Sequence, residues 1–252
     1  MDTFIGFIKN KDEIGIIGMG EVGNAVAEIY GGREKVSVAD VNYSDNLENI
    51  KILHICIPYS ELFNEVVKNF LLKYNPMITY IHSTVEPLTT KNLISSTQKI
   101  IVHSPIRGVH PHLYEGIMNF VKYIGCESIS DGNIASQHLS HYGIKTHISC
   151  PAVNTELGKL MSTSYYGLCI AYHNEMKKWC DYYNADFDIS VSHFNKTYNE
   201  GYAKLGKNNV IRPILIPPKN EKIGGHCIIS NAEILQKTFK NSLCLKTITD
   251  LK

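Results

Sequence analysis

Residues 13–32, EIGIIGMGEVGNAVAEIYGG, decide the fold. A short apolar run leads into glycines at positions 18, 20 and 23 and then into a segment with helical periodicity. In a strand–turn–helix unit of this kind, Gly18 permits the tight turn, Gly20 lets the backbone approach a pyrophosphate, and Gly23 lets the helix pack against the strand. The unpaired N–H groups of the helix N-terminus then point toward the phosphates. The stretch therefore predicts a dinucleotide-binding turn.

The next apolar run, KVSVAD at 35–40, ends in the acidic residue Asp40, about 20 residues after the turn. A carboxylate at this place hydrogen-bonds the two hydroxyls of an adenosine ribose and repels a 2′-phosphate, so we predict NAD rather than NADP as the cofactor. The alternative is a glycine turn that serves packing only, which would require turn, helix and acid to coincide. The predicted cofactor contacts are Gly18, Met19, Gly20, Glu21, Val22, Gly23, Asp40, Pro58, Ser83 and Thr84.

Apolar runs alternate with helical segments over the first 150 residues. Candidate strands lie at 13–17, 35–40, 51–58, 77–84, 99–105, 119–126 and 145–150. This alternation is typical of an α/β fold whose mainly parallel sheet carries helices on both faces. We therefore expect a Rossmann-type NAD-binding domain at 1–150.

A long helix is predicted next. Apolar residues recur at steps of three and four over 157–183, which indicates a helix of about 40 Å at about 1.5 Å per residue. The segment is apolar over much of its circumference, so it requires a partner surface. We predict a homodimer through 153–184, with packing inside one chain as the alternative.

The rest of the chain is also predicted to be helical. Further helical patterns at 187–206 and 230–239 flank a proline-rich loop. Together with the long connecting helix they predict a second domain at 151–252, a small α-helical domain that serves dimerisation.

The composition is that of an ordinary globular protein, with 252 residues, 44% hydrophobic and 19% charged. Because 25 basic side chains face 24 acidic ones, a small molecule is favoured as the partner over nucleic acid or an acidic membrane surface. No apolar run reaches the roughly 18 residues of a membrane span, and the N-terminus lacks the pattern of a signal peptide. We therefore expect a cytoplasmic protein.

Neither a disulfide framework nor a metal site is predicted. The seven cysteines form no CxxC pair. Histidines at 110 and 112, and at 138 and 141, have no third ligand at a telling spacing. Core or surface positions are the expectation for them.

Five stretches in collinear order resemble the UDP-glucose/GDP-mannose dehydrogenase family over nearly the whole chain. They are HICIPYS (54–60), HSTVEPLTT (82–90), HSPIRGVHP (103–111), TELGKLMSTSYYGLCIAYHNEM (155–176) and IGGHC (223–227). This family converts a nucleotide-sugar alcohol into its uronic acid in a four-electron oxidation that uses NAD. The resemblance implies oxidation of a primary alcohol on an activated sugar, with a sugar nucleotide or sugar phosphate as the substrate.

The resemblance also implies catalytic residues. Cys227 falls on the family's cysteine, which adds to the aldehyde from the first hydride transfer; the thiohemiacetal gives up a second hydride to become a thioester that water cleaves. Lys159 falls on the lysine that stabilises an oxyanion or orders water, and Thr84 on a threonine near the nicotinamide. Without the family, these would be a packed thiol, a solvated charge and a strand-end residue. His226 is not expected to pair with the thiol, because neighbours in an extended loop point apart.

Three positions depart from the family pattern. Ile106 stands where the family has a glutamate, Thr163 where it has an asparagine, and Asn231, which stays among the candidate catalytic residues, where it has an aspartate. Isoleucine cannot relay a proton, and asparagine cannot supply a negative charge. Besides the four-electron reaction, two alternatives are therefore open: a two-electron β-hydroxyacid-type dehydrogenase that relies on Lys159, and a NAD-binding subunit that depends on a partner and has no catalysis of its own.

The family continues after its cysteine into a further domain that holds the nucleotide, whereas about 25 residues follow Cys227 here. We therefore expect a short form in which substrate recognition relies on the two domains, on a dimer mate or on a separate chain. Arg212 is the first candidate for binding a substrate phosphate or carboxylate, followed by Arg107 and Asn195. Each of the three is otherwise a surface charge or a loop cap.

Overall fold

A computed structural model describes residues 13–217 and 226–251. The chain divides into two compact units, Met1–Lys159 and Leu160–Lys252. Helix α6 (Val153–Tyr182) begins in the first unit and continues through the second. The long helix predicted from the apolar spacing is thus present as one continuous element.

The first unit is built on an eight-stranded sheet. Its strands are β1 (Ile14–Ile17), β2 (Ser37–Asp40), β3 (Tyr43–Ser44), β4 (Ile52–Ile55), β5 (Ile78–Ile81), β6 (Ile101–His103), β7 (Lys122–Gly125) and β8 (Thr146–Ser149). Their order across the sheet is β3-β2-β1-β4-β5-β6-β7-β8. Five of the seven neighbouring pairs are parallel, and β2–β3 and β6–β7 are antiparallel. The predicted Rossmann-like, mainly parallel α/β fold is therefore confirmed.

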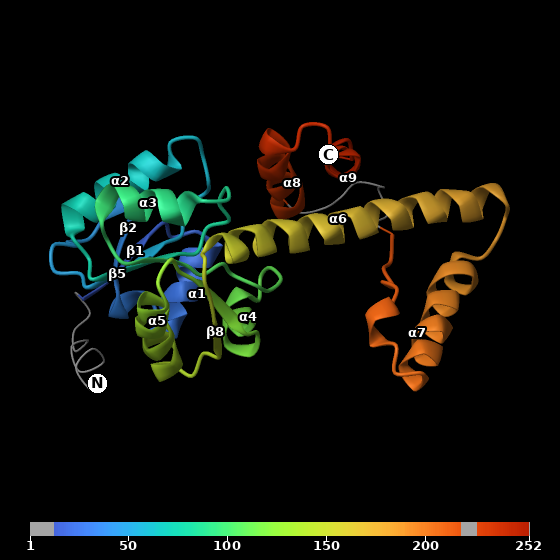
Figure 1. Cartoon of the computed structure of the whole chain (residues 1–252), viewed down its shortest axis with the longest axis horizontal. Helices are drawn as coiled ribbons and strands as arrows, with labels where there is room; N and C mark the ends of the chain where they lie inside the picture. The colour runs from blue at the N-terminus through green and yellow to red at the C-terminus, as the bar shows by residue number, and fades with distance from the viewer. Residues whose placement is uncertain (1–12, 218–225, 252) are drawn as a thin grey trace. The chain divides into compact units, whose positions relative to one another are not determined.

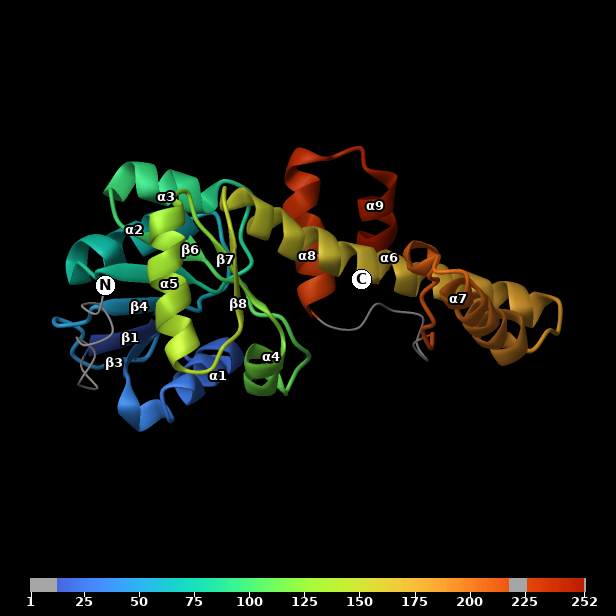
Figure 2. The same ribbon diagram turned by 60° about the horizontal axis from the view of Figure 1, so that its bottom comes forward.

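Helices cover both faces of the sheet (Figures 1 and 2). Helices α2 (Phe63–Tyr74) and α3 (Thr89–Thr97) lie on one face, and α1 (Glu21–Ile29), α4 (Leu113–Asn119) and α5 (Ile129–His141) lie on the other. Strands β1, β4 and β5 are buried at every position, because each side chain points toward one of these two layers. Their near-continuous apolar sequences follow from this double burial.

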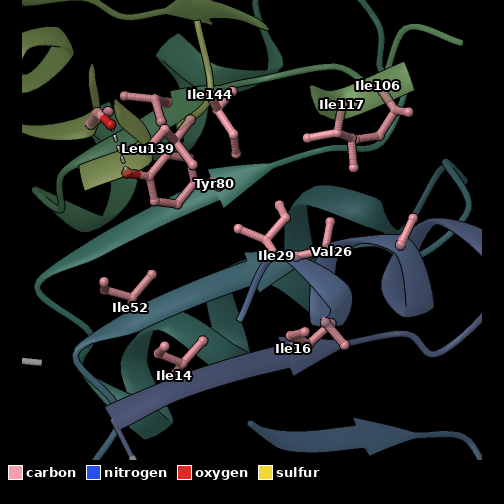
Figure 3. Close-up of a cluster of buried hydrophobic side chains, with 14 of the residues drawn as sticks. Ile14, Ile16, Val26, Ile29, Ile52, Tyr80, Ile106, Ile117, Leu139 and Ile144 are labelled. Atoms are coloured by element: carbon pink, nitrogen blue, oxygen red, sulfur yellow. Dashed lines mark hydrogen bonds between the residues drawn. The ribbon is translucent and has the colours of Figure 1, made fainter. Parts of the chain in front are cut away.

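Two hydrophobic clusters hold the layers together. On the α1 face, Val26 and Ile29 pack with Ile16 and Ile52 of the strands (Figure 3). On the α2 face, a second cluster includes Phe63. A fully buried aliphatic side chain contributes about 1.5–3 kcal/mol to folding, so these clusters fix where the strand ends lie.

The second unit consists of helices. After α6 come one π-helical turn (Asp188–His193), α7 (Phe194–Lys204), α8 (His226–Thr238) and α9 (Leu243–Thr249). Helices α8 and α9 lie beside α6 in both views (Figures 1 and 2). Gly167 of α6 permits this approach, since a Cβ there would be 2.4 Å from Ile228 of α8 and 3.4 Å from Ile248 of α9.

One local expectation is wrong. Residues 226 and 227 were expected in an extended loop, but α8 begins at His226, so Cys227 lies in the first turn of a helix. The glycines before it fall outside the described residues. Within the described part of the chain, no helix has the length and apolar character that crossing a membrane requires.

Candidate functional site

The glycine turn between β1 and α1 has the local geometry that its spacing predicts. Gly18 has φ +91°, and its N–H donates to the carbonyl of Ala39 on β2 over 2.8 Å. A Cβ at Gly18 would stand 2.9 Å from the backbone of Cys56, and one at Gly23 would stand 1.9 Å from the Gly18 oxygen. These two glycines therefore let β1, β4 and α1 approach one another closely.

Gly20 has a different environment. A Cβ built on it meets nothing within 4 Å, and Gly20 is the N-cap of α1 without a side-chain hydrogen bond to cap the helix. Glycine has no side chain that could accept hydrogen bonds from the N–H groups of the first turn, and the space where a Cβ of Gly20 would stand is open. The Asn24 amide donates to the carbonyls of Met19 and Gly20 over 2.9 and 3.0 Å and steadies the turn. The open side of Gly20 fits the close approach of a phosphate group.

Asp40 stands at the end of β2 and is connected to this turn. Its carboxylate accepts hydrogen bonds from the backbone N–H groups of Met19 and Val41 over 2.5 and 2.6 Å. These bonds, led by the one from Met19, hold the pKa of Asp40 below its usual value. The carboxylate is therefore charged at neutral pH, and two oxygens with about four lone-pair positions leave it able to accept further hydroxyl donors.

The remaining predicted cofactor contacts follow β4 and β5, the strands next to β1. Pro58 lies after β4, and the Ser83 hydroxyl, after β5, donates to the Ile57 carbonyl over 2.6 Å. Thr84 is half-buried, and its hydroxyl makes no hydrogen bond to the part of the chain that the structure describes. These residues lie at the carboxyl ends of parallel strands, the edge at which ligands bind in open α/β sheets.

Lys159 is near the same edge, in the second turn of α6. Its ammonium donates to the Ile106 carbonyl over 2.8 Å. The Ile106 side chain is only 6% exposed and lies beside Ile117 in the hydrophobic cluster on the α1 face (Figure 3). Residue 106, where the resembled family has a glutamate, therefore points its side chain into the hydrophobic cluster. It meets Lys159 through its backbone carbonyl oxygen.

A buried carboxylate fixes the start of α6. Glu156 accepts hydrogen bonds from the N–H groups of Leu88 and Thr90 over 2.6 and 2.9 Å and from the Thr90 hydroxyl over 2.7 Å. Burial raises its pKa, and the bonds from Thr90 and Leu88 oppose that shift. Because Lys159 is one helical turn further on, this anchor also positions its side chain.

Arg107 follows Ile106 on the surface. Its guanidinium lies over the rings of Phe120 and Tyr123, 5.6 and 5.4 Å from their centres, and donates to the Val121 carbonyl over 3.3 Å. The side chain is exposed, so its remaining N–H groups are accessible to an anion.

The other predicted residues belong to the second unit. Cys227 is exposed in the first turn of α8. Asn231, one turn further, is 3% exposed, and its buried Nδ2 has no hydrogen-bond partner among the described residues. A charged aspartate would be costly at such a position, which accounts for a neutral side chain there.

Asn195 belongs to α7, and Arg212 packs against the same helix. The backbone N–H and carbonyl of Arg212 both bond to the Asn199 side chain, over 2.8 and 2.9 Å, and its guanidinium lies 4.3 Å above the Tyr198 ring. The Asn195 amide donates to the Pro213 carbonyl over 3.4 Å. Both residues thus attach the segment after Arg212 to α7.

Four buried titratable residues were not predicted to be of interest. His54, His82 and His103 lie in or directly after β4, β5 and β6, and Lys122 begins β7; all are at most 3% exposed. The sequence carries one signal that could have pointed to them, a single histidine inside each of three apolar runs. The described residues contain no group of three His, Cys, Asp or Glu side chains placed to hold a metal ion.

Comparison with solved structures shows proteins of the same fold. UDP-D-ManNAc dehydrogenase from Pyrococcus horikoshii matches with a TM-score of 0.75 at 16% identity, over 94% of this chain and 67% of that chain. UDP-N-acetyl-mannosamine dehydrogenase from Staphylococcus aureus matches with a TM-score of 0.68 at 16% identity, over 94% and 67%. This chain therefore spans about two thirds of each of these proteins.

A shorter protein is matched over nearly its whole length. The 3-hydroxyisobutyrate dehydrogenase from Mycobacterium tuberculosis has a TM-score of 0.64 at 11% identity, over 94% of this chain and 91% of that chain. No protein-family model and no curated protein matches the chain. At these identities the likeness shows the fold, which the chain shares with nucleotide-sugar dehydrogenases and with a 3-hydroxyisobutyrate dehydrogenase.

Proposed function

We propose that this protein is a NAD-dependent dehydrogenase that oxidises a primary alcohol on an activated sugar. The observation that carries the proposal is the glycine turn, where Gly20 is open, the start of α1 is uncapped by a side chain, and Asp40 bonds to the turn itself. In this arrangement α1 would face the pyrophosphate, and Asp40 would accept the ribose hydroxyls. The same carboxylate would repel a 2′-phosphate, which favours NAD over NADP.

The first oxidation removes two electrons. When bound, NAD⁺ accepts a hydride from the alcohol carbon, so that RCH₂OH and NAD⁺ give RCHO, NADH and one proton. Lys159 would stabilise the developing alkoxide, because its ammonium is held in place by the Ile106 carbonyl. Thr84 has a hydroxyl available to orient the substrate or a water molecule.

A second oxidation would use Cys227. Its thiolate would add to the aldehyde, the resulting thiohemiacetal would give a hydride to a second NAD⁺, and water would cleave the thioester to give the acid and restore the thiol. Cys227 is exposed in the first turn of α8, so its sulfur is accessible to an aldehyde. Asn231, one turn away, would act as a neutral hydrogen-bonding partner.

A two-electron dehydrogenase of the β-hydroxyacid type is the second candidate. It is favoured by the burial of Ile106, which leaves no side chain there to carry a proton for thioester hydrolysis. The match over 91% of the length of 3-hydroxyisobutyrate dehydrogenase agrees with it. In this reaction Lys159 would be the main catalytic group, and Cys227 would not be required.

Substrate recognition is assigned to three side chains. Arg212, Arg107 and Asn195 would bind a phosphate or carboxylate of the substrate, and the contact of the Arg212 guanidinium with the Tyr198 ring would help to orient it. A sugar nucleotide or a sugar phosphate carries the anionic group that such residues recognise.

A homodimer through 153–184 is part of the proposal. Helix α6 exposes large aromatic side chains along its second half, with Tyr172, Trp179 and Tyr182 each at least half exposed. Such a concentration of apolar surface favours a protein partner, and a second copy is the partner we propose.

Counting NADH per substrate consumed tests the function. We expect NADH to form, seen as a rise in absorbance at about 340 nm, when the protein is given NAD⁺ and one member of a panel of sugar nucleotides, sugar phosphates and hydroxy acids. Two NADH per substrate indicate the Cys227 route, and one indicates the two-electron reaction. Lys159→Ala should lower the rate at least about a hundredfold in either case, as expected for loss of a transition-state contact of about 3 kcal/mol.

Cysteine variants separate the two reactions. Cys227→Ala should abolish the second NADH in the four-electron reaction and leave most activity in the two-electron one. Cys244→Ala is the matched control, because Cys244 is also exposed but belongs to α9. Tight NAD⁺ binding with no turnover on any substrate would contradict the proposal and would indicate a cofactor-binding subunit that depends on a partner.

A further inference from the structure

A row of buried polar side chains crosses the α1 face of the sheet. The Tyr30 hydroxyl lies 2.7 Å from His54 Nε2, His54 Nδ1 lies 2.9 Å from His82 Nε2, and His82 Nδ1 lies 2.8 Å from the Ser104 carbonyl oxygen. The two imidazoles stack with their centres 5.1 Å apart. These residues stand at the end of α1, in β4 and directly after β5 and β6, so the row exists only because the strands are in register.

The hydrogen-bond partners determine the direction of this row. A carbonyl oxygen can only accept, so His82 carries its proton on Nδ1 and leaves Nε2 as an acceptor. His54 must then donate from Nδ1, and its Nε2 accepts from the Tyr30 hydroxyl. Each ring is therefore neutral, donates one bond and accepts one. Burial lowers the pKa of His54 and of His82 well below the usual value, in keeping with neutral rings.

Lys122 stands at the inner end of the row. It is 3% exposed, donates to the carbonyls of Ser104 and Pro105 over 2.6 and 3.1 Å, and lies 3.4 Å from His82 Nδ1. No carboxylate of the described chain pairs with it. Burial lowers the pKa of Lys122 to about 7, so both the ammonium and the amine are accessible near neutral pH.

The groups around the row contribute no negative charge at neutral pH. Lys122 is faced by Cys56 after β4, whose thiol burial keeps protonated, and by Lys159 on α6. The further titratable neighbours of the row are His103 on β6, Tyr80 on β5, His138 and His141 on α5, and Tyr142 after α5. The Tyr80 hydroxyl lies 2.8 Å from His138 Nδ1 and 3.2 Å from the Ala135 carbonyl oxygen.

The two ends of the row have different surroundings. Tyr30 caps the C-terminus of α1, is half-buried and packs edge-on against Tyr142, 4.8 Å away. At the other end, the carbonyls of residues 104–106 are held by two lysines, Lys122 on the first two and Lys159 on the third. The row thus connects a partly exposed tyrosine to the backbone segment that positions the candidate catalytic lysine.

We propose that Lys122 is a buried proton-storage site that exchanges its proton with solvent through His82, His54 and Tyr30. The purpose of this exchange rests on the proposed function, because oxidation of an alcohol releases one proton at the neighbouring edge of the sheet. Loss of the Lys122 proton removes a like charge that faces Lys159.

The proton balance of one uptake event is simple. The Lys122 amine takes the Nδ1 proton of His82, whose Nε2 takes the Nδ1 proton of His54. His54 Nε2 takes the hydroxyl proton of Tyr30, and the Tyr30 oxygen takes one proton from water. One proton has moved from solvent to Lys122. His82 and His54 are again neutral but in their other tautomers, and Tyr30 is again a neutral hydroxyl. The ammonium now donates to His82 Nδ1 and to the Ser104 oxygen, so that no buried polar atom loses its partner.

Titration of the lysine side chains by NMR tests whether Lys122 stores a proton near neutral pH. The measurement uses the protein without cofactor or substrate. With lysine labelled by ¹³C and ¹⁵N, one ammonium signal, missing in Lys122→Met, should titrate near pH 7. If Lys122→Met does not fold, the ammonium signal of Lys122 is assigned instead through its NMR correlations to the backbone signals of the same residue. An ordinary lysine midpoint, about pH 10.4, would overturn the proposal. Because no turnover is needed, the result is distinguishable from a failure of the proposed function.

The path itself is tested by exchange of the Lys122 ammonium protons with water. Tyr30→Phe removes only the hydroxyl that begins the row, and we expect it to slow exchange at least tenfold. Tyr142→Phe is the matched control, because this neighbour makes no hydrogen bond to the row. Equal exchange in Tyr30→Phe and the wild type would overturn the proposed path.

Discussion

Gly20 and Gly23 are three residues apart in the same turn and have opposite surroundings. A methyl group at Gly20 would meet nothing within 4 Å, whereas one at Gly23 would be 1.9 Å from the Gly18 carbonyl oxygen. The first glycine therefore keeps space open for a ligand, and the second lets the helix pack against the strand. Spacing alone could predict both roles, because the contacts are local in the sequence.

The stability of alanine variants distinguishes these roles. Gly23→Ala should lower the free energy of unfolding by about 1–3 kcal/mol or more, as overpacking does. Gly20→Ala should leave it within about 0.5 kcal/mol of the wild type. Urea denaturation measures both, and an equally large loss in Gly20→Ala would show that the space beside Gly20 is filled by the protein itself.

Other residues of the site could not be read from the sequence. Ile106 is identified as a departure by alignment of motifs, but its burial among the side chains of the α1 face depends on α4 packing against the sheet. The central contact of the row from Tyr30 to Lys122 joins His54 to His82, which are 28 positions apart in the sequence. Strand register determines that contact, and the sequence pattern does not specify register between distant strands.

At the level of elements, a long periodic pattern in the sequence is enough to predict a strand or helix, whereas a short segment is not. The buried strands and α6 were predicted because long apolar patterns outweigh local preferences. The short helices α3, α4 and α9 were not predicted, since a segment of two turns carries too little pattern. The antiparallel direction of β7 was not predicted either, because its sequence resembles that of a parallel strand.

Two glycines of α6 give a prediction about this helix. Gly167→Ala places a Cβ 2.4 Å from Ile228 and should destabilise the packing of α8 on α6 by about 1–3 kcal/mol. Gly158→Ala is the control, since its Cβ meets nothing within 4 Å and should stabilise the helix by about 0.5–1 kcal/mol. Thermal denaturation of both variants measures the difference. A stabilising Gly167→Ala would contradict the observed packing of α8.

For the molecule as a whole, buried histidines predict sensitivity to acid. Burial lowers the pKa of His103 to about 3 and of His138 to about 4, and lowers the pKa of His54 and His82 as well. In the unfolded chain these groups titrate near about 6.5, so the unfolded state binds more protons below that pH. The contribution of these histidines to stability is therefore full above about pH 6.5 and is lost as the pH falls, at up to about 1.4 kcal/mol per pH unit for each histidine.

Urea denaturation at about pH 7 and at lower pH down to about pH 5 checks this dependence, because the histidines of the unfolded chain titrate within this range. We expect the free energy of unfolding to fall with a slope that approaches four protons per molecule. His138→Gln should reduce the slope by about one proton, because it removes one buried ring whose pKa is lowered. A flat profile over this range would mean that the buried rings are protonated in the folded state.

The measurement that tests the central claim most directly is a calorimetric titration of NAD⁺ into the wild-type protein and into Gly20→Ala. We predict saturable binding to the wild type and binding at least tenfold weaker, about 1.4 kcal/mol, to the variant at unchanged stability. NADP⁺ should bind more weakly than NAD⁺ to the wild type, because the Asp40 carboxylate at the end of β2 would repel a 2′-phosphate. Equal affinity of NAD⁺ for both proteins, or no binding to the wild type, would contradict a cofactor held at the glycine turn.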